Sequence, residues 1–185
     1  TTSRAGPFAQ AIADSFKDVS AEYPNVDGVC AIVHTEGGGT ERPNNLGFVL
    51  RALAGFMVHA NVGAILAIDH GTEAYTNDDL QDHLNDCDYP LGQVKHAFMR
   101  VSGALGEELT RAQEQISAWL PQVNQTPRTA QPLSALKIAL QCGGSDAFSG
   151  VSGNALAGWI AKEAIRHGGS ANLAETDELI GAEPY

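Results

Sequence analysis

The chain has 185 residues, of which 43% are hydrophobic, enough for one sizeable α/β domain or for one domain and part of another. Its 22 acidic residues outnumber its 11 basic ones, and the resulting formal charge of −11 disfavours binding to a phosphate backbone. No apolar run approaches the ~20 residues of a membrane-spanning helix, and three scattered cysteines do not make a disulfide framework. We therefore expect a soluble, cytoplasmic protein that binds neither nucleic acid nor a membrane. The absence of an initiator Met and the abrupt end indicate a piece of a longer polypeptide.

Apolar spacing in the first 70 residues predicts two helices and two buried strands. A helix is expected over residues 7–19, where Pro7 stands at a favoured first helical position, and another over residues 45–59. Residues 28–34 and 62–69 are continuous apolar runs too short for a helix, which is typical of strands buried on both faces. Helix and strand therefore alternate from the start of the chain.

The remaining chain continues the alternation and contains one interruption. Thr76 and Asp79 mark a helix start, and a long helix follows with an apolar face from Leu105 to Trp119. Residues 121–134 hold three prolines and little apolar periodicity, which predicts a linker. Beyond it we expect a buried strand, a helix and a short strand, over residues 136–141, 154–167 and 171–175 in that order.

These elements predict a Rossmann-like, doubly wound and mostly parallel sheet over residues 1–120. The start of a second α/β unit is expected over residues 135–185. Trp119 and Trp159 fall at helical core spacing and are interpreted as packing residues.

Polar side chains follow the predicted strands, at the sheet edge where open parallel sheets bind their ligands. The loops are residues 34–39, 69–73, 141–146 and 175–178. Imidazole, thiol and carboxylate groups at one edge could hold a divalent metal or supply an acid/base pair. Equally, each glycine-rich loop could be a plain tight turn and each histidine a hydrogen-bonded turn residue.

The segment from Cys142 to Asn154 is rich in glycine and serine and leads into a helix. Glycines allow close approach of a ligand, and free N–H groups at a helix start favour an anion. The segment is neither a P-loop nor the Gly-x-Gly-x-x-Gly fingerprint, so a carboxylate or small sugar acid fits better than a nucleotide. From its position, Cys142 is either a thiol of lowered pKa or a small buried apolar residue.

Residues 141–154, together with His167-Gly168-Gly169, Glu175-Thr176 and Gly181-Ala182-Glu183, resemble the altronate/galactarate dehydratase family, which also includes the large subunit of sulfolactate sulfo-lyase. Residues 23–29, His34-Thr35 and Leu53-Ala54-Gly55 resemble that family's middle domain, so the resemblance covers nearly the whole chain. It implies the middle domain and the start of the C-terminal domain of a hydro-lyase that converts a sugar acid such as altronate or galactarate to a 2-keto-3-deoxy acid. It also implies a divalent metal, Fe²⁺ foremost and Mn²⁺ as an alternative. A small N-terminal domain or separate small subunit and the rest of the C-terminal domain would complete the protein.

Two positions depart from the family pattern: Gly38 and Thr72 stand where relatives carry cysteine. Under the resemblance, the metal ligands are then a mixed set and the acid or base is an imidazole or a carboxylate. The assigned ligands are His34, Glu73 and Cys142, and the assigned catalytic residues are His70 and Asp146. The substrate-binding residues are assigned as Gly143, Gly144, Ser145, Ser152 and Asn154.

Three alternatives to this dehydratase stay open on the sequence. The leaving group could be sulfite, as in a C–S lyase, and the chain could equally be a non-catalytic sugar-acid-binding or assembly domain. A nucleotide-binding Rossmann module has only the analogy of fold behind it.

Apolar helix faces in excess of what the chain can cover indicate self-association into a homo-oligomer.

Overall fold

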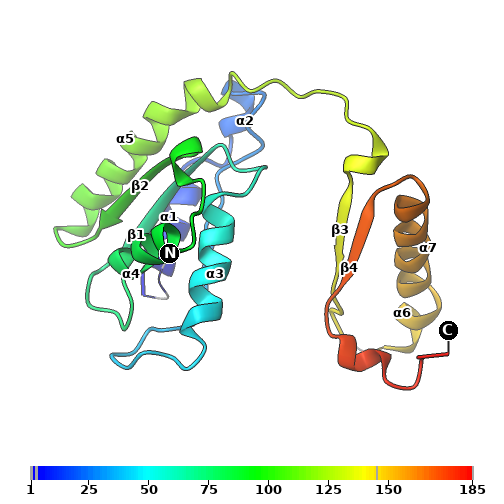
Figure 1. The fold of residues 1–185 in the computed structure, drawn as a ribbon. Helices are drawn as coiled ribbons and strands as arrows, with labels where there is room; N and C mark the ends of the chain where they lie inside the picture. Colours follow the sequence, from blue (N-terminus) through cyan, green and yellow to red (C-terminus); the bar gives the residue numbers. More distant parts are fainter. Residues whose placement is uncertain (1, 3, 145, 185) are drawn as a thin grey trace. The chain divides into compact units, whose positions relative to one another are not determined.

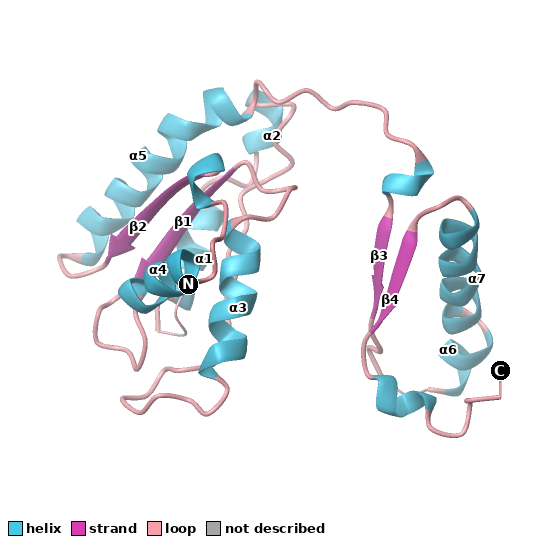
Figure 2. Cartoon of the chain, viewed as in Figure 1, coloured by secondary structure: helices cyan, strands magenta, loops and turns pink. Residues whose placement is uncertain are grey.

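The computed structural model describes residues 2, 4–144 and 146–184 and divides the chain into two compact units (Figure 1). Unit 1 comprises residues 1–128 and unit 2 comprises residues 129–185. Both units combine helices with parallel strands (Figure 2), which confirms the α/β class. A Rossmann-like doubly wound sheet stays a prediction, because each sheet assigned within the described residues has two strands.

Unit 1 places helices on both faces of a parallel strand pair. In chain order its elements are α1 (Gly6–Asp14), α2 (Val19–Glu22), α3 (Leu46–Met57), β1 (Ala64–Asp69), α4 (Asn77–Asp86), a 3₁₀ turn (Leu91–Gln93), β2 (Lys95–Arg100) and α5 (Leu105–Val123). Successive strand side chains point to opposite faces, so β1 and β2 each serve two cores. Ile68 and Met99 pack with α1 and α5, whereas Ala67 and Phe98 pack with α3 and α4.

Most predicted elements of unit 1 are confirmed. The predicted helix 7–19 forms only as α1, which ends at Asp14, since residues 15–18 are a turn and α2 begins at Val19. The predicted helix 45–59 forms as α3. The Thr76–Asp79 signal is a capping box in which the Thr76 side chain accepts from the N–H of Asp78 and the Asp79 carboxylate accepts from the Thr76 N–H. Helix α5 continues past Pro121, so the first residues of the predicted linker are helical.

The predicted buried strand at residues 28–34 is wrong in its burial. Cys30 and Val33 are exposed, and this stretch carries no strand assignment in the described part of the chain. Backbone carbonyls alternate sides along a strand. The carbonyl oxygen of Asp69 accepts from the N–H of Val101 on the β2 side, whereas that of Ile68, on the opposite side, accepts from the N–H of Thr2 at 3.1 Å. The second edge of β1 is thus taken by Thr2 at that point rather than by residues 28–34.

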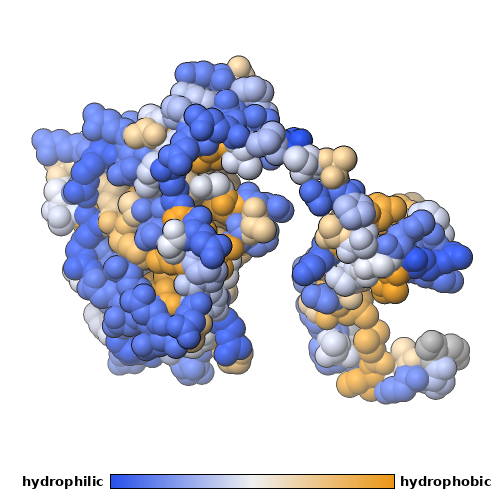
Figure 3. Space-filling view, turned by 45° about the horizontal axis from the view of Figure 1, so that its top comes forward, coloured by the Kyte–Doolittle hydropathy of each residue, from blue (hydrophilic) through white to orange (hydrophobic). Residues whose placement is uncertain are grey.

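Unit 2 is smaller and exposes much of its apolar surface. Its elements are a 3₁₀ turn (Leu133–Ala135), β3 (Lys137–Leu140), α6 (Ala147–Val151), α7 (Gly153–Arg166), β4 (Ser170–Leu173) and a second 3₁₀ turn (Thr176–Leu179). β3 and β4 are parallel, with Lys137 opposite Ser170. Apolar side chains reach the surface of this unit (Figure 3).

The predicted elements of unit 2 form, but their predicted burial is wrong. Trp159, interpreted as a packing residue, is 60% exposed, and β3 alternates between exposed and half-buried residues. On α7 the buried residues are Ala161 and Ala164, while Leu156 and Ile160 of the predicted apolar face are exposed. The reason is that α7 packs its alanine side on the strand pair, and the described residues of unit 2 provide nothing to cover its larger side chains.

Two elements escaped the sequence analysis. Strand β2 was not predicted, although its run from Lys95 to Arg100 is bounded by a 3₁₀ turn and by Ser102-Gly103. Helix α6 occupies part of what was taken as a loop. No helix in the described ranges is both long and apolar enough to cross a bilayer.

Candidate functional site

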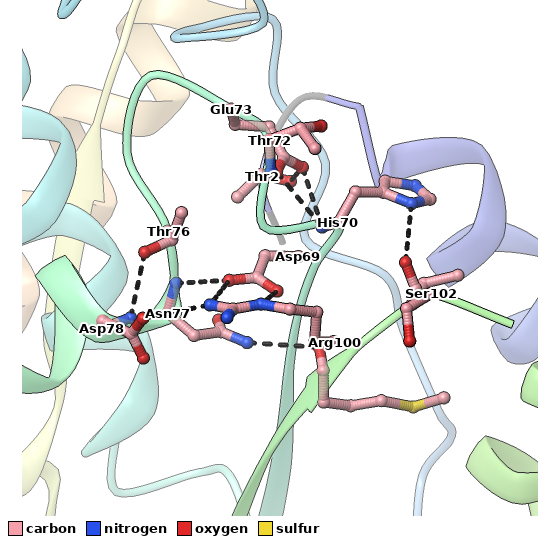
Figure 4. A network of polar contacts seen from close by, with 12 residues as sticks. Thr2, Asp69, His70, Thr72, Glu73, Thr76, Asn77, Asp78, Arg100 and Ser102 are labelled. Carbon is pink, nitrogen blue, oxygen red and sulfur yellow. Dashed lines mark hydrogen bonds and ion pairs between the residues drawn. The ribbon is translucent and has the colours of Figure 1, made fainter.

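The carboxyl ends of β1 and β2 carry an ion pair between a buried carboxylate and a half-exposed guanidinium, which the sequence analysis missed. Asp69 is fully buried, and the Arg100 guanidinium donates to it through Nε at 3.1 Å and through a terminal nitrogen at 3.2 Å (Figure 4). The backbone N–H of Asn77 donates to the same carboxylate at 2.7 Å, and its side-chain amide donates to the carbonyls of Ala67 and Met99. This network ties the two strand ends to the start of α4.

The next residues form a tight loop that is closed by the Glu73 carboxylate. Glu73 accepts from the N–H of His70 at 3.1 and 3.2 Å, from the N–H of Thr72 at 3.0 Å and from the Thr2 hydroxyl at 2.5 Å. Burial alone would raise the pKa of Glu73, but these hydrogen bonds outweigh it and hold the pKa below its usual value. Glu73 is therefore ionised at neutral pH, with both oxygens engaged.

The loop turns on Gly71, whose φ of 72° lies in the left-handed region. A Cβ at that position would collide with the Arg100 side chain. Any larger residue would therefore both strain the backbone and displace the guanidinium that holds Asp69.

His70 extends from this loop with one ring nitrogen bound to the backbone. Its Nδ1 lies 3.3 Å from the carbonyl oxygen of Val101, the residue that follows β2 (Figure 4). A carbonyl only accepts hydrogen bonds, so Nδ1 carries the proton in the neutral ring and Nε2 carries the lone pair. The side chain is half-buried at the carboxyl edge of the strand pair.

His34 occupies the neighbouring loop and uses both ring nitrogens. The N–H of Glu36 donates to Nδ1 at 3.2 Å, and Nε2 lies 3.1 Å from the hydroxyl of Tyr75. The two rings are stacked with centroids 6.3 Å apart. Tyr75 is 1% exposed, and burial, followed by the nearby charges of Glu36 and Glu73, raises its pKa to about 12.

Arg4 joins the two loops of unit 1. Its Nε donates to the carbonyl of Gly38 at 2.7 Å, and a terminal nitrogen donates to the hydroxyl of Thr72 at 3.3 Å. The expectation that the loops after the predicted strands lie together is therefore met for residues 34–39 and 69–73. Gly38 and Thr72, the two positions that the sequence analysis expected to depart from the family pattern, are both partners of Arg4.

In unit 2, Cys142 and Glu175 meet at the carboxyl ends of β3 and β4. The Glu175 carboxylate accepts from the N–H of Cys142 at 3.1 Å and from the side-chain amide of Gln141 at 3.3 Å. Glu175 adopts φ 59°, an uncommon left-handed conformation for a residue other than glycine. Cys142 is half-buried, so its exposure is intermediate between that of a reactive surface thiol and that of a small buried apolar residue, the two alternatives that the sequence left open.

Asp146 begins helix α6 as its N-cap. Its carboxylate accepts from the N–H of Ser149 at 2.8 Å and from the Ser149 hydroxyl at 2.5 Å. The hydroxyl and N–H of Ser149 lower the pKa of this exposed carboxyl, so it is an anion at neutral pH. As an anion Asp146 has no proton to donate, and its lowered pKa makes it a weak base.

The predicted substrate-binding residues surround α6. Gly143, Gly144 and Asn154 are exposed, and a Cβ at either glycine would meet no atom within 4 Å. Ser152 donates its hydroxyl hydrogen to the carbonyl of Phe148 at 2.6 Å. Ser145 lies outside the described residues.

The predicted metal ligands divide between the units: His34 and Glu73 belong to unit 1 and Cys142 to unit 2. In unit 1 the two side chains do not fit a metal as they stand, because both Glu73 oxygens and both His34 ring nitrogens already have protein partners. Among residues 2, 4–144 and 146–184, no three His, Cys, Asp or Glu side chains are grouped so that they could hold an ion.

Tyr75, Asp69 and Arg100 are the main residues that sequence reasoning missed. An aspartate at the end of an apolar run was a usable signal, since a buried carboxylate requires a charged partner. Its partner was out of reach of the same reasoning, because β2 was not predicted and Arg100 stands at its last position, opposite Asp69.

The comparisons with known proteins agree on one family along nearly the whole chain. The profile described as D-galactarate dehydratase/Altronate hydrolase, second domain, matches residues 1–124, and that of D-galactarate/Altronate dehydratase, C-terminal, matches residues 133–185. Altronate dehydratase from Bacillus subtilis (strain 168) is 29% identical over 183 residues, which are 95% of this chain and 34% of that protein. Altronate dehydratase from Escherichia coli (strain K12) is 27% identical over 176 residues, again 95% of this chain and 34% of the relative.

A third relative matches more closely over a shorter stretch. Galactarate dehydratase (L-threo-forming) from Escherichia coli (strain K12) is 40% identical over 63 residues, which are 34% of this chain and 12% of that enzyme. The chain thus spans about a third of the length of the two altronate dehydratases. No solved structure is significantly similar.

Proposed function

Because the chain belongs to the D-galactarate dehydratase/altronate hydrolase family, we propose that it is part of a hydro-lyase that removes water from a sugar acid. The observation that carries the proposal is that two successive regions of this family match residues 1–124 and 133–185. The proposed substrate is an aldonate or aldarate such as altronate or galactarate, and the proposed product is a 2-keto-3-deoxy acid. We propose that the protein acts in the cytoplasm.

The reaction requires a base at the carbon next to the substrate carboxylate. Removal of that proton leaves an enediolate, which expels hydroxide from the adjacent carbon. His70 and Asp146 are the proposed acid/base residues. The Nε2 lone pair of His70 supports a proton-accepting role, whereas the lowered pKa of Asp146 makes its carboxylate a weak base.

The proposed substrate-binding turn is the Gly143–Asn154 stretch of unit 2. The exposed glycines at 143 and 144 leave space in which a carboxylate could approach the backbone. We propose that they hold this group together with Ser145, Ser152 and Asn154. Ser152 would have to give up its bond to the Phe148 carbonyl to donate to a ligand.

Metal dependence, with Fe²⁺ or Mn²⁺, is a separate proposal that rests on the family resemblance. A bound divalent ion would stabilise the negative charge of the enediolate. The hydrogen bonds of His34 and Glu73 count against these two as ready ligands, which leaves the thiol of Cys142 as the remaining candidate.

The resemblance likewise underlies the proposal of a small N-terminal domain or subunit. Exposed apolar side chains of unit 2 support self-association.

The decisive test is a dehydration assay on the full-length protein with a panel of aldonates and aldarates, alongside anaerobic calorimetric titration with Fe²⁺ and Mn²⁺. Release of a 2-keto-3-deoxy acid from one of them is the expected result. Release of sulfite from sulfolactate would replace water by sulfite as the leaving group. Ligand binding with turnover of neither class would make the protein a non-catalytic member. Full activity after exhaustive metal removal would overturn the metal proposal alone.

A further inference from the structure

The two imidazoles at the carboxyl edge of unit 1 differ in what their ring nitrogens can still do. His34 has a donor at Nδ1 and the Tyr75 hydroxyl at Nε2. His70 has its Nδ1–H on the Val101 carbonyl, so Nε2 retains a lone pair. Of the two rings, His70 is therefore the one arranged to accept a proton.

The loop around His70 is held from three sides. The Glu73 carboxylate binds the His70 N–H at 3.1 Å, and the Val101 carbonyl binds the ring. Val101 is itself fixed to β1, because its N–H donates to Asp69 O at 2.8 Å. The Asp69–Arg100 pair below the loop completes the support. The position and tautomer of His70 are thus set by the strand pair rather than by solvent.

We propose that Glu73 is a positioning residue: by binding the backbone N–H of His70 it holds the loop so that the ring keeps its Nδ1–H on the Val101 carbonyl and Nε2 acts as the base of the dehydration. The inference rests on the proposed function for its reaction. In that step the C–H bond beside the carboxylate breaks and an N–H bond forms at Nε2, while the electron pair stays on the substrate as an enediolate. The enediolate then returns to a carboxylate as its electron pair forms a C=C bond to the adjacent carbon, which expels hydroxide. The hydroxide takes the proton back from the imidazolium and leaves as water, and the resulting enol tautomerises to the 2-keto-3-deoxy acid. No oxidant or reductant is needed.

The first test reads the tautomer without any assay of activity. The full-length protein is labelled with ¹⁵N-histidine, and the His70 ring signals are assigned by their loss in His70→Gln. The expected spectrum has a protonated Nδ1 and an unprotonated Nε2, with a mixture of tautomers in Glu73→Gln. A wild-type ring protonated at Nε2, or a Glu73→Gln spectrum identical to wild type, overturns the positioning role.

The second test separates positioning from binding by kinetics. His70→Gln should lower kcat by about 10²-fold or more, the usual contribution of a placed acid or base. Glu73→Gln should lower kcat roughly tenfold with KM within about twofold, because the base is displaced while the binding groups are intact. Glu41→Gln removes an exposed carboxylate from the loop before α3 and serves as the matched control with unchanged kcat.

The outcomes distinguish this inference from the proposed function. Normal kcat in His70→Gln overturns His70 as the base while the dehydratase assignment stands. Absence of turnover on every sugar acid overturns the function, and the tautomer spectrum still decides the role of Glu73. If Glu73→Gln fails to fold, Glu73→Asp keeps the charge on a shorter side chain and is judged by the same spectrum.

Discussion

Unit 1 and unit 2 use the same parallel strand–helix–strand connection but differ in how completely they bury it. In unit 1 helices lie on both faces of β1 and β2, and the buried residues include Tyr75, Met57 and Leu84. In unit 2 the buried apolar residues among those described are Ala161 and Ala164. Parallel sheets are normally covered on both faces. The difference shows that the connection by itself does not make a core, since the core comes from the layers on either side of it.

The largest expected effect is on the buried side chains of unit 1. Leu84→Ala should lower the free energy of unfolding by about 2–5 kcal/mol, because it removes a fully buried side chain and leaves a cavity. Leu156→Ala in unit 2 is the matched control and should change it by no more than about 0.5 kcal/mol. Chemical denaturation measures both. Equal losses would mean that Leu156 is buried in solution, and the contrast between the units would fall.

A smaller effect is expected at the Asp69–Arg100 ion pair. Asp69→Asn keeps the shape of the side chain but removes the charge facing the half-exposed Arg100, and should cost about 1–3 kcal/mol through the hydrogen bonds that are lost. Asp78→Asn removes the exposed second carboxylate on the same guanidinium and should cost less than about 1 kcal/mol. If the two variants lose the same stability, the network at the strand ends does not depend on burial.

Helix starts allow a finer comparison of the units. Thr76→Ala removes one half of the capping box of α4 and should lower the free energy of unfolding by about 1 kcal/mol. Asp146→Ala removes the corresponding cap of the exposed, five-residue helix α6, and we expect a smaller loss. Amide hydrogen exchange in the two first turns resolves each effect locally. Greater loss of protection in α6 than in α4 would contradict this order.

The smallest effect concerns pH and Glu108. The N–H groups of Gly103 and Ser102 and the charge of Arg111 hold the pKa of this carboxyl below its usual value of 4.5, against the opposing effect of burial. A lowered folded pKa contributes stability above the unfolded pKa and loses it as the pH falls through the folded pKa. Glu108→Gln should therefore be less stable than wild type at neutral pH, and the gap should close below pH 4.5. Glu107→Gln, one residue away and exposed, is the matched control and should change the stability at neutral pH by no more than about 0.5 kcal/mol.

How much of the candidate site could be read from the sequence depended on the range of the interactions. Thr76 with Asp79, and the polar loops at 34–39 and 69–73, are local patterns and were predicted. The roles of Glu73 and His34 were not, because their partners include Thr2 and Tyr75, 71 and 41 residues away. A carboxylate that closes a loop and one that holds a metal look alike until its hydrogen-bond donors are known.

The sequence by itself determined the α/β class, most of the helices and strands, and the family, since local periodicity and short motifs carry these. Only the tertiary structure decided which apolar runs are buried, because burial of residues 28–34 or of α7 depends on what the rest of the chain places against them. It also decided that the His70 ring faces the carbonyl of Val101, which follows a different strand and from which the Nδ1–H tautomer is inferred. The two imidazoles at this edge are the same residue type, and what distinguishes them is the hydrogen-bond partners that other parts of the fold supply.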